Sequence, residues 1–150
     1  MAHVKTGTET ERVLALLGGK RVFRRRLSGS NDIREELRRG LPFAAFDALL
    51  RILEVRPQEL ASVLGVAART LARRKMSRQL SPIESDRLYR IAFIAYMASE
   101  VLGSIDKART WLQGANRALG GHSPISRLDT EIGERQVEDL LNRINYGIVS

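Results

Sequence analysis

The stretch ELASVLGVAARTLARRK, residues 59–75, decides the fold of the first half of this chain. It reads as a short apolar helix, a turn at Gly65, and a second helix that carries four Lys or Arg within seven residues. Two helices that cross closely need a small residue in the first helix and a glycine in the turn, and Ala61 and Gly65 supply them four residues apart. The stretch therefore fits a helix-turn-helix, and the alternative is an ordinary helical hairpin with a basic, solvated face.

The second helix of this stretch carries side chains suited to DNA. In a helix-turn-helix the second helix lies in the major groove, with its N-terminal residues nearest the bases. Arg69 and Arg73 are four residues apart and share one helix face. An arginine can read guanine or clamp a phosphate through its paired donors, and small alanines let the helix approach the groove. The predicted DNA-binding residues are Ala68, Arg69, Thr70, Ala72, Arg73, Arg74 and Lys75.

Two positions depart from the usual helix-turn-helix pattern. Ala67 stands where Ser or Thr would cap the second helix, which loses on the order of 1 kcal/mol of capping. Arg74 follows Leu71 by three residues, where an apolar residue normally faces inward. We therefore expect a bent or short helix, or an arginine stem that covers the core while its charge stays in water.

The composition predicts an all-α protein of one or two small domains. The chain has 150 residues, 43% of them hydrophobic, and lacks the β-branched runs that are typical of strands. It contains no cysteine, which excludes disulfides and cysteine-ligated metal sites. No signal-peptide pattern is seen in the first ten residues, and no apolar run is long enough to span a bilayer. We therefore expect a cytoplasmic protein without a membrane partner.

The positive charge lies in one half of the sequence. The net charge of the whole chain is +8, but residues 1–80 hold 17 Lys or Arg and 8 Asp or Glu, a balance of +9. Residues 81–150 hold 8 and 9, a balance of −1. This asymmetry favours a polyanionic partner for the first half, most often nucleic acid, over a merely basic surface.

Turn and cap residues predict that the chain is divided into three parts. Ser81, Pro82 and Glu84 mark the start of a helix that runs to Leu102 and is apolar on more than one face. We expect this helix to join two lobes and to contribute to a dimer surface. The predicted parts are a helical, basic and partly disordered segment over residues 1–39, a helix-turn-helix domain over 40–80, and the connecting helix with a second lobe over 81–150.

Further helices are expected on either side of this connecting helix. Trp111, in helical register with Ala108 and Leu112, is predicted to be a core anchor. Thr130 caps a last helix that ends at residues 145–147. Other helices are predicted over residues 9–17 and 33–39, from Pro42, from Pro57, over 105–112 and over 125–129. The predicted stripe of the last helix comprises Ile132, Gln136 or Val137, Leu140, Leu141 and Ile144.

The residues needed for an active site are missing from the pattern. The two histidines, His3 and His122, have no partner at metal-ligand spacing, and the Gly-Gly pairs belong to turns. No nucleophile, base and orienting group occur together. We therefore predict no catalytic residue, no metal site, no cofactor and no enzyme activity.

An ordered series of residues runs through the second half of the chain. The series consists of Ala108, Trp111, Leu112, Asn116, Ala118, Leu119, Gly120, Gly121, Pro124, Leu128, Asp129, Thr130, Gly133, Val137, Leu140, Leu141, Ile144 and Gly147. This series resembles the toxin-binding domain of Xre/MbcA/ParS-type antitoxins. The stretch at residues 59–75 resembles their Xre-like helix-turn-helix, Gly40-Leu41-Pro42 matches its entry, and residues 78–88 resemble the segment between the two domains. The resemblance covers residues 40–147.

The resemblance implies a type II antitoxin with two partners, a toxin and operator DNA. The toxin would be a RES-domain protein that degrades NAD, so NAD would be the partner's substrate and not a ligand of this chain. The antitoxin would block the NAD pocket with its C-terminal lobe and repress its own operon, as a homodimer within a larger complex. The predicted toxin-binding residues are Arg143, Asn145, Tyr146, Gly147, Ile148, Val149 and Ser150.

The short apolar tail supports that division independently of the resemblance. A protruding segment such as residues 146–150, with a free carboxylate, can enter a concave pocket and satisfy arginines there. A frayed terminus is the plainer explanation. Two other functions remain open: a free-standing dimeric DNA-binding repressor without a toxin, and a purely structural helical interaction protein.

Overall fold

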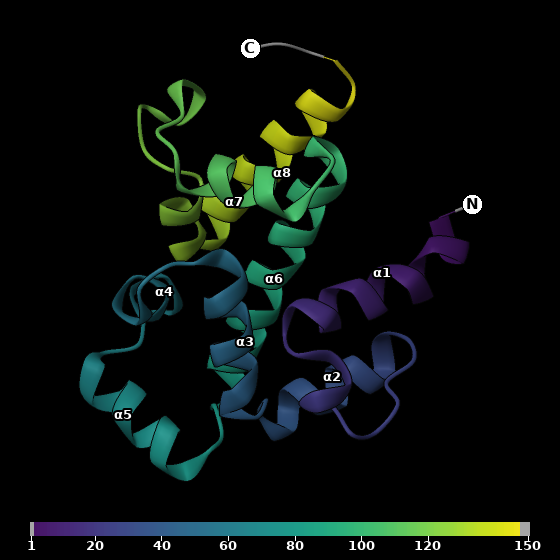
Figure 1. Ribbon diagram of the computed structural model, residues 1–150, viewed down its shortest axis with the longest axis vertical. Helices are drawn as coiled ribbons and strands as arrows, with labels where there is room; N and C mark the ends of the chain where they lie inside the picture. The colour runs from purple at the N-terminus through teal and green to yellow at the C-terminus, as the bar shows by residue number, and fades with distance from the viewer. Residues whose placement is uncertain (1, 148–150) are drawn as a thin grey trace. The chain divides into compact units, whose positions relative to one another are not determined.

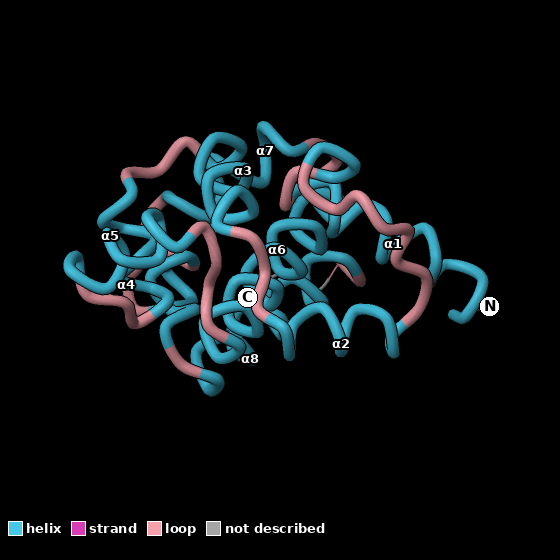
Figure 2. The backbone as a smooth tube through the Cα atoms, turned by 90° about the horizontal axis from the view of Figure 1, so that it is seen from below, coloured by secondary structure: helices cyan, strands magenta, loops and turns pink. Residues whose placement is uncertain are grey.

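The computed structural model describes residues 2–147 of the chain, with side chains from residue 9 onward, and the described part is all-α (Figure 1). It divides between Ala92 and Phe93 into two compact units. Helices joined by short loops make up both units (Figure 2). Unit 1 comprises α1 (Ala2–Leu16), the 3-10 turn η1 (Gly19–Arg21), α2 (Ser30–Arg39), α3 (Phe43–Leu53), α4 (Pro57–Leu64), α5 (Ala68–Ser77) and the first half of α6 (Pro82–Leu102).

The predicted helices form, with shifted ends at several places. α6 occupies the predicted range, Pro82–Leu102, because Ser81 and Glu84 make the reciprocal capping hydrogen bonds that the sequence indicates. α2 starts three residues before the predicted Ile33. The helix predicted over residues 9–17 is wrong at both ends, because α1 starts at Ala2 and ends at Leu16.

The core of unit 1 comes from the inner faces of α1, α3, α4 and α6. Phe46, Leu49 and Leu53 recur on one face of α3 and are at most 1% exposed. They share this core with Leu60 and Leu64 of α4, which are fully buried. α5 differs, since none of its residues is fully buried. α5 therefore lies at the surface of unit 1 and contributes no fully buried residue to the core.

A backbone contact, here called the clasp, closes the segment that contains α3, α4 and α5. The N–H of Leu80 donates to the carbonyl of Leu41 at 2.9 Å, and the N–H of Phe43 donates to the carbonyl of Arg78 at 3.0 Å. The buried Ser85 hydroxyl of α6 accepts from the N–H of Leu41 at 2.7 Å. Gly40 has a φ of +94°, and a Cβ there would collide with the carbonyl oxygen of Leu80. The clasp fixes both ends of the segment on α6.

Unit 2 is a small lobe in which a helix packs on irregular turns. It comprises the rest of α6 and α7 (Ile105–Gln113), η2 (Arg117–Leu119), η3 (Ile125–Asp129) and α8 (Glu131–Asn145). Ser104 and Thr130 cap α7 and α8 by accepting from the N–H groups of Lys107 and Gly133. A Cβ at Gly133 would collide with the carbonyl of Arg127, so this glycine allows η3 to lie directly on α8.

Two positions predicted for the buried stripe of α8 are wrong. Ile132 is 71% exposed, and Ile144 is 37% exposed at the edge of the apolar stripe. Val137, Leu140 and Leu141 are buried as predicted. Trp111, predicted as a core anchor, is only half-buried. The buried stripe of α8 is therefore shorter than the sequence pattern suggests and comprises Gly133, Val137, Leu140 and Leu141.

Candidate nucleic-acid interface and partner-binding lobe

The turn between α4 and α5 has the geometry of a helix-turn-helix. Gly65 ends α4 in the left-handed conformation, with a φ of +73°, and the N–H of Val66 donates to the carbonyl of Ala61 at 2.9 Å. From α6, the Nη1 atom of Arg87 donates to the carbonyl of Leu64 at 2.8 Å. The turn is thus held both by its own backbone and by a side chain of the neighbouring helix, α6, and α5 extends away from it (Figure 1).

Ala67 occupies the cap position of α5, and no side chain caps this helix. The prediction that Ala67 leaves this helix without a side-chain cap is confirmed. Leu71 is half-buried and is the main apolar anchor of α5. α5 lacks both a side-chain cap and a buried apolar stripe. Further stabilisation of its position must therefore come from polar contacts at its C-terminal end.

Arg74 makes that polar contact. Its Nε atom donates to Oε1 of Glu84 at 2.8 Å and its Nη2 atom donates to Oε2 at 3.1 Å. Glu84 is also the capping residue of α6, since its carboxylate accepts from the N–H of Ser81 at 2.9 Å. The guanidinium is thereby turned toward α6, on the inner side of α5. We assign Arg74 to holding α5 in place, which differs from the predicted DNA contact.

The titration of Glu84 reflects these contacts. Its burial alone would raise the pKa of the carboxyl group, but the hydrogen bonds from Arg74 and Ser81 and the charge of Arg74 outweigh that effect. The net pKa is lowered, so the carboxylate stays ionised in the folded state. The same hydrogen bond and charge raise the pKa of Arg74.

The outer face of α5 carries the predicted DNA-reading residues. Arg69, Ala72 and Arg73 are exposed, whereas Thr70 is half-buried and its hydroxyl accepts from Arg73 at 3.4 Å. Ala68 and Lys75 are exposed toward the edge of this face. The face presents two arginines with small residues between them, which is an arrangement that fits the major groove.

Sequence reasoning missed Met76 on this face. Its side chain is 86% exposed and lies seven residues after Arg69 and three after Arg73, which is the spacing of one helix face. An exposed methionine beside two arginines can make apolar contact with a thymine methyl group or a sugar. The three- and four-residue spacing could have identified it.

In unit 2, part of the predicted toxin-binding set lies at the end of α8. Arg143, Asn145, Tyr146 and Gly147 are all exposed there, with Tyr146 at 75%. The chain leaves the helix through two hydrogen bonds, from the N–H of Tyr146 to the carbonyl of Asn142 and from that of Gly147 to the carbonyl of Ile144. The other predicted residues, Ile148, Val149 and Ser150, lie outside the described residues.

A polar cleft of about 340 Å³ lies beside this end of α8. Arg127 of η3 and Arg143 of α8 line it, together with Gln136 and Asp139. The Nη2 atom of Arg127 donates to the carbonyl of Leu119 at 3.2 Å, while its buried Nε atom makes no hydrogen bond within the described part of the chain. Sequence reasoning did not identify Arg127, because its proximity to α8 depends on the η3 turn.

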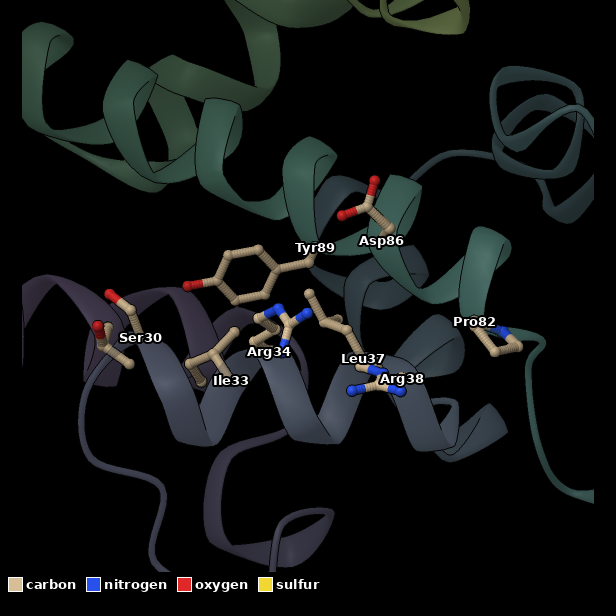
Figure 3. A pocket seen from close by; sticks show the side chains of 9 residues that line it. Ser30, Ile33, Arg34, Leu37, Arg38, Pro82, Asp86 and Tyr89 are labelled. Carbon is tan, nitrogen blue, oxygen red and sulfur yellow. The ribbon is translucent and has the colours of Figure 1, made fainter.

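A second cleft, of about 360 Å³, lies in unit 1 between α2 and α6 (Figure 3). Arg34 and Arg38 of α2 face Asp86 and Tyr89 of α6 across it. Burial, together with the charge of Glu9, raises the pKa of Tyr89, so its phenol is neutral at physiological pH. The cleft holds no set of groups suited to covalent catalysis. Its lining residues lie where α2 and α6 meet.

Within residues 2–147 there is no cluster of His, Cys, Asp or Glu that could hold a metal ion. No single described helix is long and apolar enough to cross a membrane; α6 and α7 meet the length and composition test only when counted together across a bend of 114°.

Comparisons with known proteins match both halves of the chain. Residues 32–92 match the model of the antitoxin Xre-like helix-turn-helix domain, and residues 97–147 match that of the antitoxin Xre/MbcA/ParS C-terminal toxin-binding domain.

Three curated relatives are each named antitoxin Xre. The protein from Yersinia enterocolitica is 29% identical over 118 residues, which cover 77% of this chain and 80% of the relative. The protein from Photorhabdus laumondii is 32% identical over 116 residues, covering 76% and 78%. The protein from Pseudomonas putida is 39% identical over 83 residues, covering 55% and 52%.

Proposed function

This chain belongs to the Xre antitoxin family, and on that premise we propose that it neutralises a RES-domain toxin that degrades NAD and represses its own operon. Unit 1 supplies the DNA contact and unit 2 supplies the toxin contact. The observation that carries the proposal is the matching division of the molecule: a helix-turn-helix with an exposed, arginine-bearing second helix in one unit, and a toxin-binding family domain in the other.

The operator contact is made by the outer face of α5. Arg69 and Arg73 contact guanine edges or phosphates, and Ala72 lets the helix approach the bases. The hydroxyl of Thr70 and the ammonium group of Lys75 contact the phosphate backbone, and the small side chain of Ala68 lies beside Arg69 at the groove. Since one short helix reads only a few base pairs, two copies of the chain bind two half-sites as a homodimer in the cytoplasm.

The toxin contact is centred on the end of α8. Tyr146 offers a large amphipathic ring, which is a common anchor at protein interfaces. Arg143 and Asn145 flank it with polar groups, and the apolar residues Ile148 and Val149 follow Gly147 in the sequence. The segment that ends with Ser150 enters the active-site pocket of the toxin and keeps NAD out. NAD is therefore a substrate of the partner and has no site on this chain.

Truncation after Asn145 tests this division of labour. The truncated chain loses residues 146–150 but retains all of α8, so its fold should persist. We expect loss of toxin neutralisation in a growth assay, with operator binding retained in a gel-shift assay. Unchanged neutralisation would contradict the plug mechanism. A chain that binds its operator but no toxin at all would support the alternative, a free-standing dimeric repressor.

A further inference from the structure

Arg78 ends the DNA-facing helix α5 in a backbone conformation that disfavours arginine. Its φ is +64° and its ψ is +19°, which is the left-handed region. Glycine is the usual residue at this position of a helix end, because a Cβ is unfavourable there. Within residues 2–147 the only other non-glycine residue with a positive φ is Glu54, at the end of α3. The chain thus retains an arginine where glycine would fold more easily.

The clasp fixes the place of Arg78 and brings a second arginine beside it. The N–H of Arg78 donates to the carbonyl of Arg74, and its own carbonyl accepts from the N–H of Phe43 at 3.0 Å. The Nε2 atom of the next residue, Gln79, donates to the carbonyl of Arg39 at 2.7 Å. The ends of α5 and α2 are therefore held side by side, with Arg78 on one and Arg39 on the other.

Both arginines are exposed, and neither makes an ion pair within residues 2–147. Arg74, four residues before Arg78, is by contrast fully engaged with Glu84. Glu35 and Glu36 of α2 are the nearest acidic residues along the chain to Arg39, and no ion pair joins them to it in the described structure. The positive charge at the clasp is therefore available to a partner.

The length of α5 points to the partner. A helix of ten residues is about 15 Å long, whereas the major groove of DNA is about 12 Å wide. When the N-terminal part of α5 contacts the bases, its other end reaches the phosphates that flank the groove. Two exposed arginines at that end carry the charge that attracts a phosphate backbone.

We propose that Arg78, with Arg39 beside it, clamps a DNA phosphate at the C-terminal end of α5. This contact lies outside the outer face that reads the bases, and it rests on the proposed DNA-binding function. It explains why the disfavoured conformation carries an arginine: the side chain serves binding and not the fold. The clamp contributes equally to every DNA sequence, since a phosphate carries no base identity.

Arg78→Gly separates binding from folding, because it removes the charge and relieves the backbone at once. We expect an unchanged or higher melting temperature. For a 24-base-pair duplex of arbitrary sequence, we expect about 8-fold weaker binding at 0.1 M salt for each clamp lost. The reason is that each lost phosphate contact leaves about one counterion bound to the DNA. The slope of log Kd against log salt should fall by about 0.9 for each clamp. Arg39→Ala should act in the same direction, and Arg78→Lys should largely restore binding.

Two variants serve as matched controls. Glu54→Gly relieves the same backbone conformation at the end of α3 and should neither weaken DNA binding nor lower the salt slope. Arg51→Ala removes one exposed positive charge from α3, away from the clasp, and should leave the salt slope unchanged.

The outcomes distinguish this inference from the proposed function. If the unmodified chain binds no DNA, both are wrong. If it binds DNA and Arg78→Gly retains the full salt slope, only the phosphate clamp is wrong. If Arg78→Gly weakens binding to one sequence alone with an unchanged slope, Arg78 contacts a base, which also overturns the clamp.

Discussion

Arg74 of α5 and Glu84 of α6 are joined by two hydrogen bonds, at 2.8 and 3.1 Å, between a guanidinium and both oxygens of a carboxylate. The same carboxylate caps α6 by accepting from the N–H of Ser81. One side chain therefore caps the start of α6 and also holds α5 in place. This relationship explains how α5, which has no side-chain cap and no fully buried residue, keeps a defined position.

Glu84→Ala should loosen both helices. It removes the capping bond of α6 and leaves Arg74 without its partner, so we expect about 1–2 kcal/mol of destabilisation. For a chain of this size that corresponds to a drop of about 2–4 °C in Tm per kcal/mol, measurable by calorimetry. Glu59→Ala, which breaks the exposed pair with Arg56, is the matched control and should change Tm very little. Equal effects of the two variants would contradict the role assigned to Glu84.

The Glu84 carboxyl should also make stability depend on acidity. Its pKa in the folded state lies below the ordinary value of 4.5, so its contribution is fully present above that value. The contribution is lost as the pH falls through the folded pKa. Urea unfolding between pH 7 and pH 3 should therefore show a loss of stability below about pH 4.5 that is smaller in Glu84→Gln. An identical pH profile in the two proteins would count against this coupling.

Arg69→Ala and Arg73→Ala should each weaken binding to the operator strongly, because each removes one guanidinium from the outer face of α5. A bidentate contact to a base discriminates by about 1–3 kcal/mol, so we expect a loss of about tenfold or more for each variant. Fluorescence anisotropy with promoter DNA measures it.

Arg74→Met keeps the apolar stem but removes the charge that faces Glu84. We expect a smaller loss of operator affinity for this variant than for Arg73→Ala, measured at a temperature where both are folded. A larger loss would restore Arg74 to the DNA contact first predicted from the sequence.

Two glycines test whether the units carry separate functions. At Gly40, alanine would be strained by the positive φ, by about 1–3 kcal/mol, and would collide with Leu80 in the clasp. At Gly133, alanine would push η3 away from α8 by colliding with Arg127. We expect Gly40→Ala to weaken DNA binding while toxin neutralisation persists. We expect Gly133→Ala to weaken toxin neutralisation while DNA binding persists. Loss of both functions in each variant would contradict the assignment of one function to each unit.

Local signals predicted the helices well. The sequence Ser81-Pro82-Ile83-Glu84 contains its own capping bonds, so the start of α6 follows without knowledge of the rest of the chain. The turn at Gly65 follows from the need for a left-handed residue after α4. Such features depend on neighbours within four residues and are visible in any window of the sequence.

Contacts between distant elements escaped prediction. Glu84 was recognised as a cap but not as the partner of Arg74, and Gln79 gave no hint of its bond to Arg39, forty residues away. The exposure of Ile132 was missed because a helical stripe does not say how far the opposing turns extend. Arg78 was missed because its backbone conformation is set by the clasp and not by its residue type.

The proposed neutralisation of a RES-domain toxin is tested most directly by the NAD content of cells that produce such a toxin together with this chain. With the full-length chain co-expressed, NAD should stay at the level of cells without toxin. With the chain truncated after Asn145, NAD should fall as it does with toxin alone. If NAD falls to the same extent whether or not the full-length chain is present, the chain does not neutralise this toxin and the central proposal is wrong.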